Sequence, residues 1–426
     1  MLVPALRSSP GVAWTVIAGV IAALSLPFGF ALAFDASAWV VWGRELWSLS
    51  IDTGAGPSWK PLPLVVTAPF APLGLGAEAW LLVARAGALL AVIGGARLAW
   101  RTAGWWGVPI TVAAIVASPW WLLNAALGNA DPLLGALVVW AVLAHVEDRP
   151  RAAFWLLVAG ALIRPEVWPF LAGYALWLAW RQRIAWRAVV GAGVGVLALW
   201  VIPDLLSSGL ESTKGATGTP SAGSAGLTEV PFLSVWADLV EQATWPVLLA
   251  ALVGTFVLVR TGHPQRRVVA VGLGLVAAYV LLVATMAQLG FAGNPRYLVP
   301  ALTLLAAVAG SVAAVGGPGR NGPAIVGLVV TAAIVVVGGS DLDGQRTLIA
   351  DRAATRDALQ RTIEDAGGRD ALTRCGPVRT DPVVRSVVAE LLRESIPEAG
   401  GRPQPGDATL RPASDGAGWT AVAGRC

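Results

Sequence analysis

Acidic and basic residues stand in short groups beside long apolar stretches of this 426-residue chain. Only 13% of its residues are charged, whereas 56% are hydrophobic. Ionisable side chains at membrane depth cost free energy, so each group indicates either a function or a buried pair. The groups are Asp35 with Lys60, Asn129–Asp131, Arg164–Glu166, Asp204 and Asn294–Tyr297.

These residue types favour one kind of reaction. A carboxylate can take a proton from an acceptor hydroxyl, while arginine or lysine stabilises a phosphate leaving group. That combination suits glycosyl transfer outside the membrane, from a sugar carried on a lipid phosphate that enters from the bilayer. The sequence contains only two histidines, His145 and His263, and no cysteine–histidine metal cluster, Walker loop or dinucleotide motif. Nucleotide-dependent chemistry and nucleic-acid binding are therefore unsupported.

Each group also has a purely structural explanation. Asp131 could cap the N-terminus of a helix that begins at Pro132. Arg164 and Glu166 could form a structural ion pair, and Arg296 could anchor the chain to lipid headgroups. The segment around Asp35 could be a solvated loop with anchoring tryptophans. The stronger argument for a site is that all the groups occur at the span ends predicted to lie on the outer face of the membrane.

The elements that must position these groups are membrane helices. Apolar runs of about 17–25 residues have the length that spans a bilayer. We therefore predict an all-α polytopic membrane protein with about eleven transmembrane helices. They lie near residues 12–33, 78–99, 107–124, 132–146, 152–164, 166–180, 188–206, 245–260, 268–289, 297–315 and 323–339.

The segment from Phe34 to Pro63 carries Asp35, Lys60 and four tryptophans. Trp39, Trp42, Leu46 and Leu49 recur at helical spacing, which predicts a helix over 36–49 lying in the membrane interface. Tryptophan favours that depth because its ring is apolar and its N–H needs a polar partner. The proline-containing stretch 62–76 is predicted to be a re-entrant or interfacial segment.

The distribution of arginine predicts the orientation, because cytoplasmic loops are enriched in basic residues. If the N-terminus is cytoplasmic, the inner loops hold most of the arginines. These include Arg97 and Arg101, Arg149 and Arg151, Arg181, Arg183 and Arg187, and Arg260, Arg266 and Arg267. An odd number of spans then places the C-terminal domain outside the cytoplasm, and the protein is expected in the plasma membrane.

Composition changes at Asp341, after which the chain is charged. We predict a transmembrane domain over 1–340 and a small soluble, extracytoplasmic α/β or α+β domain over 341–426. Helices are expected over 341–365 and 383–395, and a loosely ordered segment from Pro397 onward. Both cysteines, Cys375 and Cys426, lie in this domain, and an even pair in an exported domain suggests a disulfide, although two free thiols remain an alternative.

The layout resembles the membrane glycosyltransferases of the GT-C fold that use polyprenyl-phosphate sugars, and in particular their actinobacterial members. The resemblance rests on four features over roughly residues 1–340. These are Phe34-Asp35 after the first span, the first loop ending in Trp59-Lys60-Pro61-Leu62-Pro63, the broken pair around Leu162-Ile163-Arg164-Pro165-Glu166, and Asn294-Pro295-Arg296-Tyr297-Leu298 before a late span.

The resemblance implies roles for these residues. Asp35 matches the catalytic base, and Lys60, Arg296 and Arg164 match the groups that bind the donor phosphate. We expect a second set to bind substrate or support the first: Arg44, Asp131, Glu166, Asn294 and Tyr297. Many members carry two adjacent acids, whereas Ala36 follows Asp35 here. No metal ligand is therefore assigned, and a divalent cation, Mg²⁺ or Mn²⁺, is left open, with Asp131 as a second carboxylate.

These observations lead to one functional hypothesis. The protein transfers a pentose or hexose, as a mannosyltransferase or arabinosyltransferase would, from a polyprenyl-phosphate donor to a cell-envelope glycan or glycolipid. Membrane lipid is a further expected partner. The alternative is a multi-span transporter or lipid flippase, which predicts polar residues deep within several spans and inverted repeats. A non-catalytic scaffold for the C-terminal domain would not explain the polar groups at the span ends.

Overall fold

The protein is described by a computed structural model that covers residues 10–210, 223–317, 319, 321–339, 342–400, 403–413 and 418–425. Asp341 and Cys426, on which two of the predictions rest, lie outside the described residues. The boundary between the predicted domains 1–340 and 341–426 therefore stays a prediction, as does the Cys375–Cys426 disulfide.

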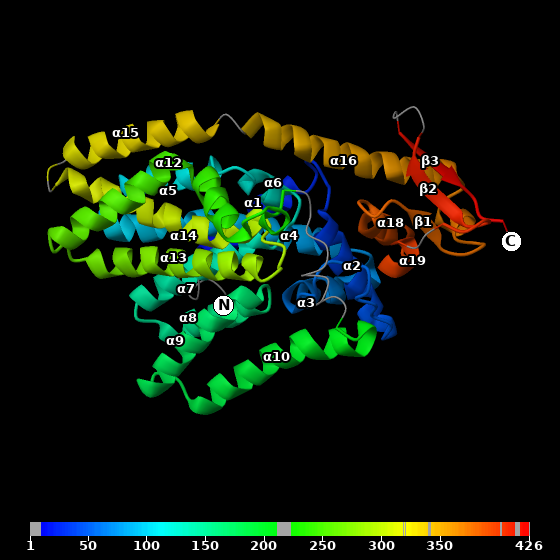
Figure 1. Cartoon of the computed structure of the whole chain (residues 1–426), viewed down its shortest axis with the longest axis horizontal. Helices are drawn as coiled ribbons and strands as arrows, with labels where there is room; N and C mark the ends of the chain where they lie inside the picture. The colour runs from blue at the N-terminus through cyan, green and yellow to red at the C-terminus, as the bar shows by residue number, and fades with distance from the viewer. Residues whose placement is uncertain are drawn as a thin grey trace, which may run out of the picture.

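The chain is mostly helical, and its helices pack as an elongated bundle that carries a small sheet at one end (Figure 1). The helices of the membrane part are α1 (Pro10–Ser25), α2 (Phe34–Ser48), α3 (Pro61–Phe70), η2 (Ala71–Leu73), α4 (Gly76–Ala103), α5 (Gly107–Val116), α6 (Trp121–Ala126), α7 (Asp131–Val146), α8 (Pro150–Ala161), η3 (Pro165–Val167), α9 (Trp168–Trp180), α10 (Trp186–Ser208), η4 (Ala225–Leu227), α12 (Pro231–Arg260), α13 (Arg266–Gln288), η5 (Pro295–Leu298), α14 (Val299–Gly310), η6 (Ser311–Gly316) and α15 (Asn321–Gly338).

Each predicted span coincides with helical structure, which confirms the polytopic all-α fold. Among the described residues, six helices are long and apolar enough to cross a membrane, and several shorter apolar helices accompany them. The boundaries differ where the backbone breaks. The span predicted over 107–124 ends at Val116 and continues as the separate helix α6, and α12 begins well before residue 245. Within α12, Thr244 leaves helical geometry two residues before Pro246, so proline produces the kink there.

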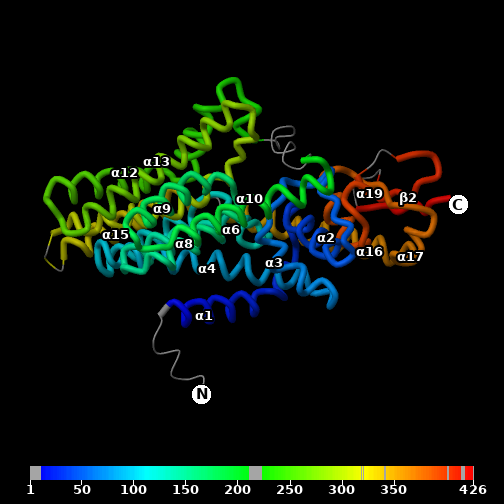
Figure 2. The backbone as a smooth tube through the Cα atoms, turned by 90° about the horizontal axis from the view of Figure 1, so that it is seen from below, coloured from blue at the N-terminus to red at the C-terminus, as the bar shows by residue number. Residues whose placement is uncertain are grey.

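The centre of the bundle is α14, in which all 12 residues are buried. It packs against α4, α5, α7, α12 and α13. By contrast, only 11% and 17% of the residues in the most apolar stretches of α10 and α15 are buried. Their exposed apolar side chains suit contact with lipid, because exposing an apolar group costs free energy in water but not in hydrocarbon. α1 runs along α4 at the edge of the bundle (Figure 2).

The helix predicted over 36–49 forms as α2, but Trp39 and Trp42, which were predicted to lie in the membrane interface, face the protein core. Trp39 and Trp42 are 0% exposed and belong to the protein core, packed against Trp80 and Trp59. Leu49, in contrast, is 89% exposed. Helical spacing identifies a face, but lipid and protein interior are both apolar, so spacing alone does not separate them. The stretch 62–76 contains most of α3 and all of η2, and the left-handed Gly74 follows the end of η2 at Leu73.

The C-terminal part contains the remaining elements. These are α16 (Leu342–Asp365), α17 (Arg369–Leu372), β1 (Val378–Thr380), α18 (Arg385–Leu392), α19 (Ile396–Gly400), β2 (Ala408–Pro412) and β3 (Trp419–Val422). The strands form a sheet in the order β1-β2-β3, with a parallel and then an antiparallel pair. The expectation of loose order after Pro397 was wrong, because β2 and β3 lie there. Buried Leu359, Val388 and Leu410 give this part its own small core.

The C-terminal part lies against the membrane part at α2 (Figure 1). The Ser386 hydroxyl donates to the Phe34 carbonyl at 2.8 Å, and Arg44 Nη2 donates to the Glu394 carbonyl at 2.7 Å. Ile396 is buried and belongs to the same hydrophobic cluster as Trp39 and Trp42 of α2. One face of α2 is therefore held by the C-terminal part, which leaves another face to meet the bundle.

Candidate active site

Six ionisable side chains, three acids and three bases, meet where the ends of several helices converge. Asp35 comes from the first turn of α2, Lys60 from the residue before α3, and Asp131 from the first turn of α7. Arg164 and Glu166 lie between α8 and α9, and Arg296 lies in η5 before α14. We call this set the charge cluster; it consists of Asp35, Lys60, Asp131, Arg164, Glu166 and Arg296.

Asp35 is shared by two cations. Its Oδ2 accepts from Arg296 Nη2 at 2.8 Å and lies 3.5 Å from Lys60 Nζ. Asp35 is 7% exposed and Lys60 is 4% exposed, so water screens these charges weakly. Lys60 Nζ also lies 5.0 Å from the centre of the Trp39 ring, which adds a cation–π contact.

Asp131 and Glu166 share the third cation. Arg164 Nε donates to Asp131 Oδ1 at 2.7 Å, and Arg164 Nη1 donates to Glu166 Oε1 at 3.2 Å. The Arg164 guanidinium lies 3.8 Å from the centre of the Tyr297 ring. Arg296 links the two halves of the cluster, because its Nε is 4.0 Å from Asp131 Oδ2.

Local backbone structure explains these positions. Asn294 Oδ1 accepts from the Arg296 backbone N–H at 3.1 Å and so caps η5. Proline at the start of α3, η3, η5 and α7 begins each helix without losing an internal hydrogen bond. Asp131 stands inside the first turn of α7, and Ala130 is the residue that precedes the helix. The side chain of Asp131 is therefore used by Arg164 rather than as a helix cap.

The charge cluster contains eight of the nine residues predicted for the catalytic and binding roles, when its immediate neighbours Asn294 and Tyr297 are included. Arg44 is the exception, since it contacts the C-terminal part instead. Asp204 also lies elsewhere: its Oδ1 accepts from Thr53 Oγ1 at 2.7 Å. The structure brings the predicted residues together, and their roles stay predictions.

Two contributors were missed as site residues. Asn129 Oδ1 accepts from Arg296 Nη1 at 2.9 Å, and Asn129 Nδ2 donates to Asn124. Asn129 stands in the same polar group as Asp131, so the sequence carried a signal for it. Tyr279 in the middle of α13 was not singled out, because a lone tyrosine within an apolar span is usually a packing residue.

Burial and neighbouring charges shift the pKa values of Asp35 and Lys60 in opposite directions. Burial raises the pKa of Asp35, but the charges of Arg296, Lys60 and Arg164 outweigh burial and leave the pKa below its usual value. Burial lowers the pKa of Lys60 to about 8, and Asp35 only partly offsets this. Asp35 is therefore ionised near neutral pH, while Lys60 titrates slightly above it.

Several buried polar atoms around the cluster have no hydrogen-bond partner among the described residues. The donors are Arg164 Nη2, Arg296 Nε and Trp39 Nε1; Glu166 Oε2 is an acceptor, and Tyr279 Oη can act as either. A buried polar group without a partner costs about 1–3 kcal/mol. Two such guanidinium N–H groups suit an anion, and the mixture of donors and acceptors suits hydroxyl groups.

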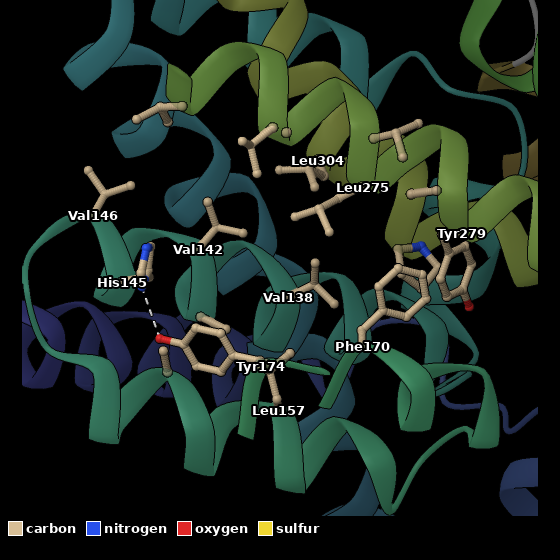
Figure 3. A pocket seen from close by; sticks show the side chains of 18 of the residues that line it. Val138, Val142, His145, Val146, Leu157, Phe170, Tyr174, Leu275, Tyr279 and Leu304 are labelled. Atoms are coloured by element: carbon tan, nitrogen blue, oxygen red, sulfur yellow. Dashed lines mark hydrogen bonds between the residues drawn. The ribbon is translucent and has the colours of Figure 1, made fainter. Parts of the chain in front are cut away.

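An apolar cavity of about 470 Å³ lies between α7, α9, α13 and α14 (Figure 3). Tyr279 stands at one end of it, and His145 stands at the other, where its Nδ1 lies 3.0 Å from the Tyr174 hydroxyl (Figure 3). The Tyr279 end adjoins the charge cluster, because Val167 and Pro300 line the cavity and closely follow Glu166 and Tyr297 in the chain. The arrangement can therefore hold a ligand with an apolar tail and a polar, anionic head.

The structure is that of a polytopic α-helical membrane protein with a GT-C-like fold. Among solved structures, it is similar to ArnT from Cupriavidus metallidurans. The structure of that protein bound to undecaprenyl phosphate superposes with a TM-score of 0.58 at 16% identity, covering 90% of this chain and 84% of that one. Its apo structure superposes with a TM-score of 0.60 at 16% identity, covering 95% and 93%. At this identity the likeness establishes the fold.

Sequence comparison adds little to this assignment. No family model matches the chain. The protoheme IX farnesyltransferase of Chloroflexus aurantiacus is 33% identical over 162 residues, which is 36% of this chain and 25% of that protein. The chain thus spans a quarter of that relative, and the match carries no assignment of family.

Proposed function

We propose that this protein is a membrane glycosyltransferase that moves a sugar from a polyprenyl-phosphate donor to a glycan or glycolipid acceptor of the cell envelope. The observation that carries the proposal is the sharing of Asp35 Oδ2 by Arg296, at 2.8 Å, and Lys60, at 3.5 Å. A base and two phosphate-binding groups are thereby within reach of one reacting centre. The ArnT-like fold supports the same class of donor.

The donor would bind in two parts. Its isoprenoid chain would occupy the apolar cavity, and its phosphate would lie against Lys60, Arg296 and Arg164. The unpartnered Arg164 Nη2 and Arg296 Nε support this placement, since charge-assisted hydrogen bonds to phosphate would satisfy both. The sugar hydroxyls would then meet the remaining polar atoms of Glu166 and Tyr279.

The reaction would be a single inverting displacement. The acceptor oxygen forms a bond to the anomeric carbon, and the bond from that carbon to the phosphate oxygen breaks. Asp35 takes the acceptor proton, and the departing electron pair stays on the polyprenyl phosphate, where Lys60 and Arg296 stabilise it. As the phosphate takes up these cations, Asp35 loses their stabilising charge and becomes a stronger base.

A divalent cation, Mg²⁺ or Mn²⁺, is not built into this mechanism. No group of three or more histidine, cysteine, aspartate or glutamate residues suited to a metal occurs among the residues that the structure describes. Asp35 and Asp131, the two carboxylates that could ligate a metal, are each engaged by arginine. Transfer measured with and without a chelator tests the metal directly.

The testing experiment uses purified protein, a labelled polyprenyl-phosphate sugar and an acceptor extract. Release of polyprenyl phosphate only when acceptor is present supports transfer; release without acceptor, or movement of intact donor across the bilayer, favours the flippase alternative. Asp35→Asn should lower the transfer rate about 100- to 10,000-fold, because it removes the base. Glu45→Gln is the matched control, since it replaces another buried carboxylate of α2 outside the cluster.

The cellular arrangement and substrates belong to this proposal as well. The charge cluster would face the outer side of the plasma membrane, with the N-terminus in the cytoplasm and the C-terminal part outside. The transferred sugar would be a pentose such as arabinose or a hexose such as mannose, and a panel of labelled donors would identify it.

A further inference from the structure

A second polar cleft, separate from the charge cluster, lies between the membrane part and the C-terminal part. Its volume is about 680 Å³, and its walls come from α2 and η2 on one side and from α16, α17 and α18 on the other. Arg44 lines this cleft. Arg44 follows Asp35 by nine positions on α2, and at about 100° per residue the two side chains lie on opposite sides of the helix.

The cleft carries uncompensated positive charge. Three arginines line it: Arg44, Arg369 and Arg393. None of them forms an ion pair with any residue in the described ranges. The cleft also contains two acids, and an arginine from outside the cleft balances one of them.

The two acids are Glu390 and Glu364. Glu390 Oε1 accepts from Arg356 Nη2 at 2.9 Å, so its charge is balanced by an arginine outside the cleft. Glu364 Oε1 accepts from Gln360 Nε2 at 3.0 Å, a neutral partner, so Glu364 keeps its negative charge in the cleft. Three arginines against this one unbalanced acid leave the cleft with excess positive charge, which an anion would offset.

The arginines are close enough to repel one another. Burial lowers the pKa of Arg44, and the charges of Arg393 and Arg369 lower it further, against the opposing effect of Glu45 and Glu390. Arg393 also has a left-handed backbone, with φ of 56°, which is unfavourable for a residue with a side chain. Its Nη2 lies over Gly74 of the membrane part, where a Cβ would be 3.6 Å away. An anion that bridges the guanidinium groups would offset this repulsion.

The surroundings indicate that the anion is attached to a lipid. Pro72 and Gly74 line the cleft, and the residues that alternate with them, Leu73 and Leu75, are 70% and 46% exposed. Phe70 is 43% exposed beside them. Exposed apolar side chains beside a cluster of arginines are the pattern expected of a surface that meets anionic lipid headgroups.

We propose that this cleft binds the phosphodiester headgroup of an anionic membrane lipid through Arg44, Arg369 and Arg393. The bound headgroup joins η2 of the membrane part to α17 and α18 of the C-terminal part. The inference is independent of the proposed glycosyl transfer, because the cleft lies on the other side of α2 from the charge cluster.

The test uses the full-length protein in nanodiscs that contain equal amounts of phosphatidylglycerol and phosphatidylcholine. After gentle release from the disc, mass spectrometry measures the lipid that stays bound. The wild-type protein should retain phosphatidylglycerol in preference to phosphatidylcholine. The triple variant Arg44→Gln, Arg369→Gln, Arg393→Gln should retain at least about tenfold less phosphatidylglycerol, given the attraction of each arginine for an anionic surface.

Two controls locate the effect. Arg411→Gln removes an exposed arginine of β2 outside the cleft and should leave lipid retention unchanged. The triple variant is also compared in the Arg296→Gln background, where the charge cluster holds less lipid, and it should lower retention there to the same extent. If the triple variant folds poorly, the single variant Arg393→Gln replaces it, with its thermal unfolding measured in parallel. Arg393→Gln should lower phosphatidylglycerol retention without a matching loss of stability.

Three results would overturn the inference. The triple variant could retain as much phosphatidylglycerol as the wild type, or phosphatidylcholine could be retained equally well. In the third, soluble glycerol phosphate would displace the lipid at a similar concentration, which would make the cleft a site for a soluble anion.

Discussion

The two ends of α7 carry the same residue types in different surroundings. At one end, Asp131 is 1% exposed and belongs to the charge cluster. At the other end, past Val146, Glu147 contacts Arg97, Arg101 and Arg149, and Asp148 contacts Arg183. Glu147 itself is only 12% exposed, but Arg101 and Arg149 are 44% and 46% exposed. Arg183 and Asp148 are 47% and 84% exposed. The ends are only about 24 Å apart along the helix, at about 1.5 Å per residue.

The difference shows that the burial of a charged group determines whether stability can explain its presence. Exposed ion pairs contribute little to stability because water and salt screen them. Buried ion pairs cost desolvation energy that a hydrophobic core would avoid, so stability alone does not explain why they are there. The second set is what the predicted orientation expects, with arginines at the inner surface, whereas the first supports the proposed function.

The largest expected effect tests the buried half of this comparison. Arg164→Met leaves the buried carboxylates of Asp131 and Glu166 without their cation, which should lower the free energy of unfolding by about 3–5 kcal/mol. Denaturant unfolding in detergent measures it. Adding Asp131→Asn and Glu166→Gln to the Arg164→Met chain should recover much of the lost free energy of unfolding, because no unpaired carboxylate then remains. A loss below about 1 kcal/mol would show that the cluster is as well solvated as the exposed end.

The second prediction concerns pH. Because burial lowers the pKa of Lys60 to about 8, its ammonium charge is lost as pH rises through that value. Donor affinity should therefore fall above pH 8, with KM rising up to about tenfold per pH unit once Lys60 is mostly neutral. Steady-state kinetics from pH 7 to 9.5 measures this.

A matched variant separates Lys60 from other groups that titrate in that range. Lys60→Arg keeps the charge at every pH of the experiment, so its KM should stay flat from pH 7 to 9.5. If the wild-type KM is also flat, the cluster does not use the Lys60 charge to bind donor.

The smallest effect belongs to the exposed end of α7. Asp148→Asn removes the partner of Arg183 but keeps a residue type that tolerates the left-handed backbone at this position, where φ is 54°. Stability should change by less than about 1 kcal/mol, and less still at high salt. The same unfolding assay applies, and a change as large as that of Arg164→Met would erase the contrast between the two ends.

Much of this fold could be predicted from the sequence because lipid imposes a simple rule. Every spanning segment must be apolar and helical, so residue type and run length suffice to locate it. Helix breaks were placed less well, although prolines mark them: Pro119 lies between α5 and α6, and Pro246 follows the kink at Thr244. A sheet was predicted in the C-terminal α/β or α+β domain, but strands β2 and β3 were not located, because they are short and follow a segment rich in proline and glycine.

The site was predictable for a similar reason, since charge beside hydrocarbon is rare enough to be noticed. Asp35 and Lys60 were selected from one segment and Arg296 from another far along the chain, and the structure places Asp35 in contact with both cations. Arg44 was assigned with them because it stands on the same helix as Asp35, and only the helical rotation separates the two. Trp39 shows the same limit, because its helical spacing fits a lipid-facing residue and a core residue equally well.

The central claim is that Asp35 and the donor phosphate compete for the same two cations, Lys60 and Arg296. The most direct measurement is the affinity of purified protein for polyprenyl phosphate in wild type and in Asp35→Asn, by calorimetry or a labelled lipid. The account predicts that Asp35→Asn binds this lipid about tenfold more tightly while transfer is lost, because the cations are released to the phosphate. Weaker or unchanged binding together with retained transfer would contradict it.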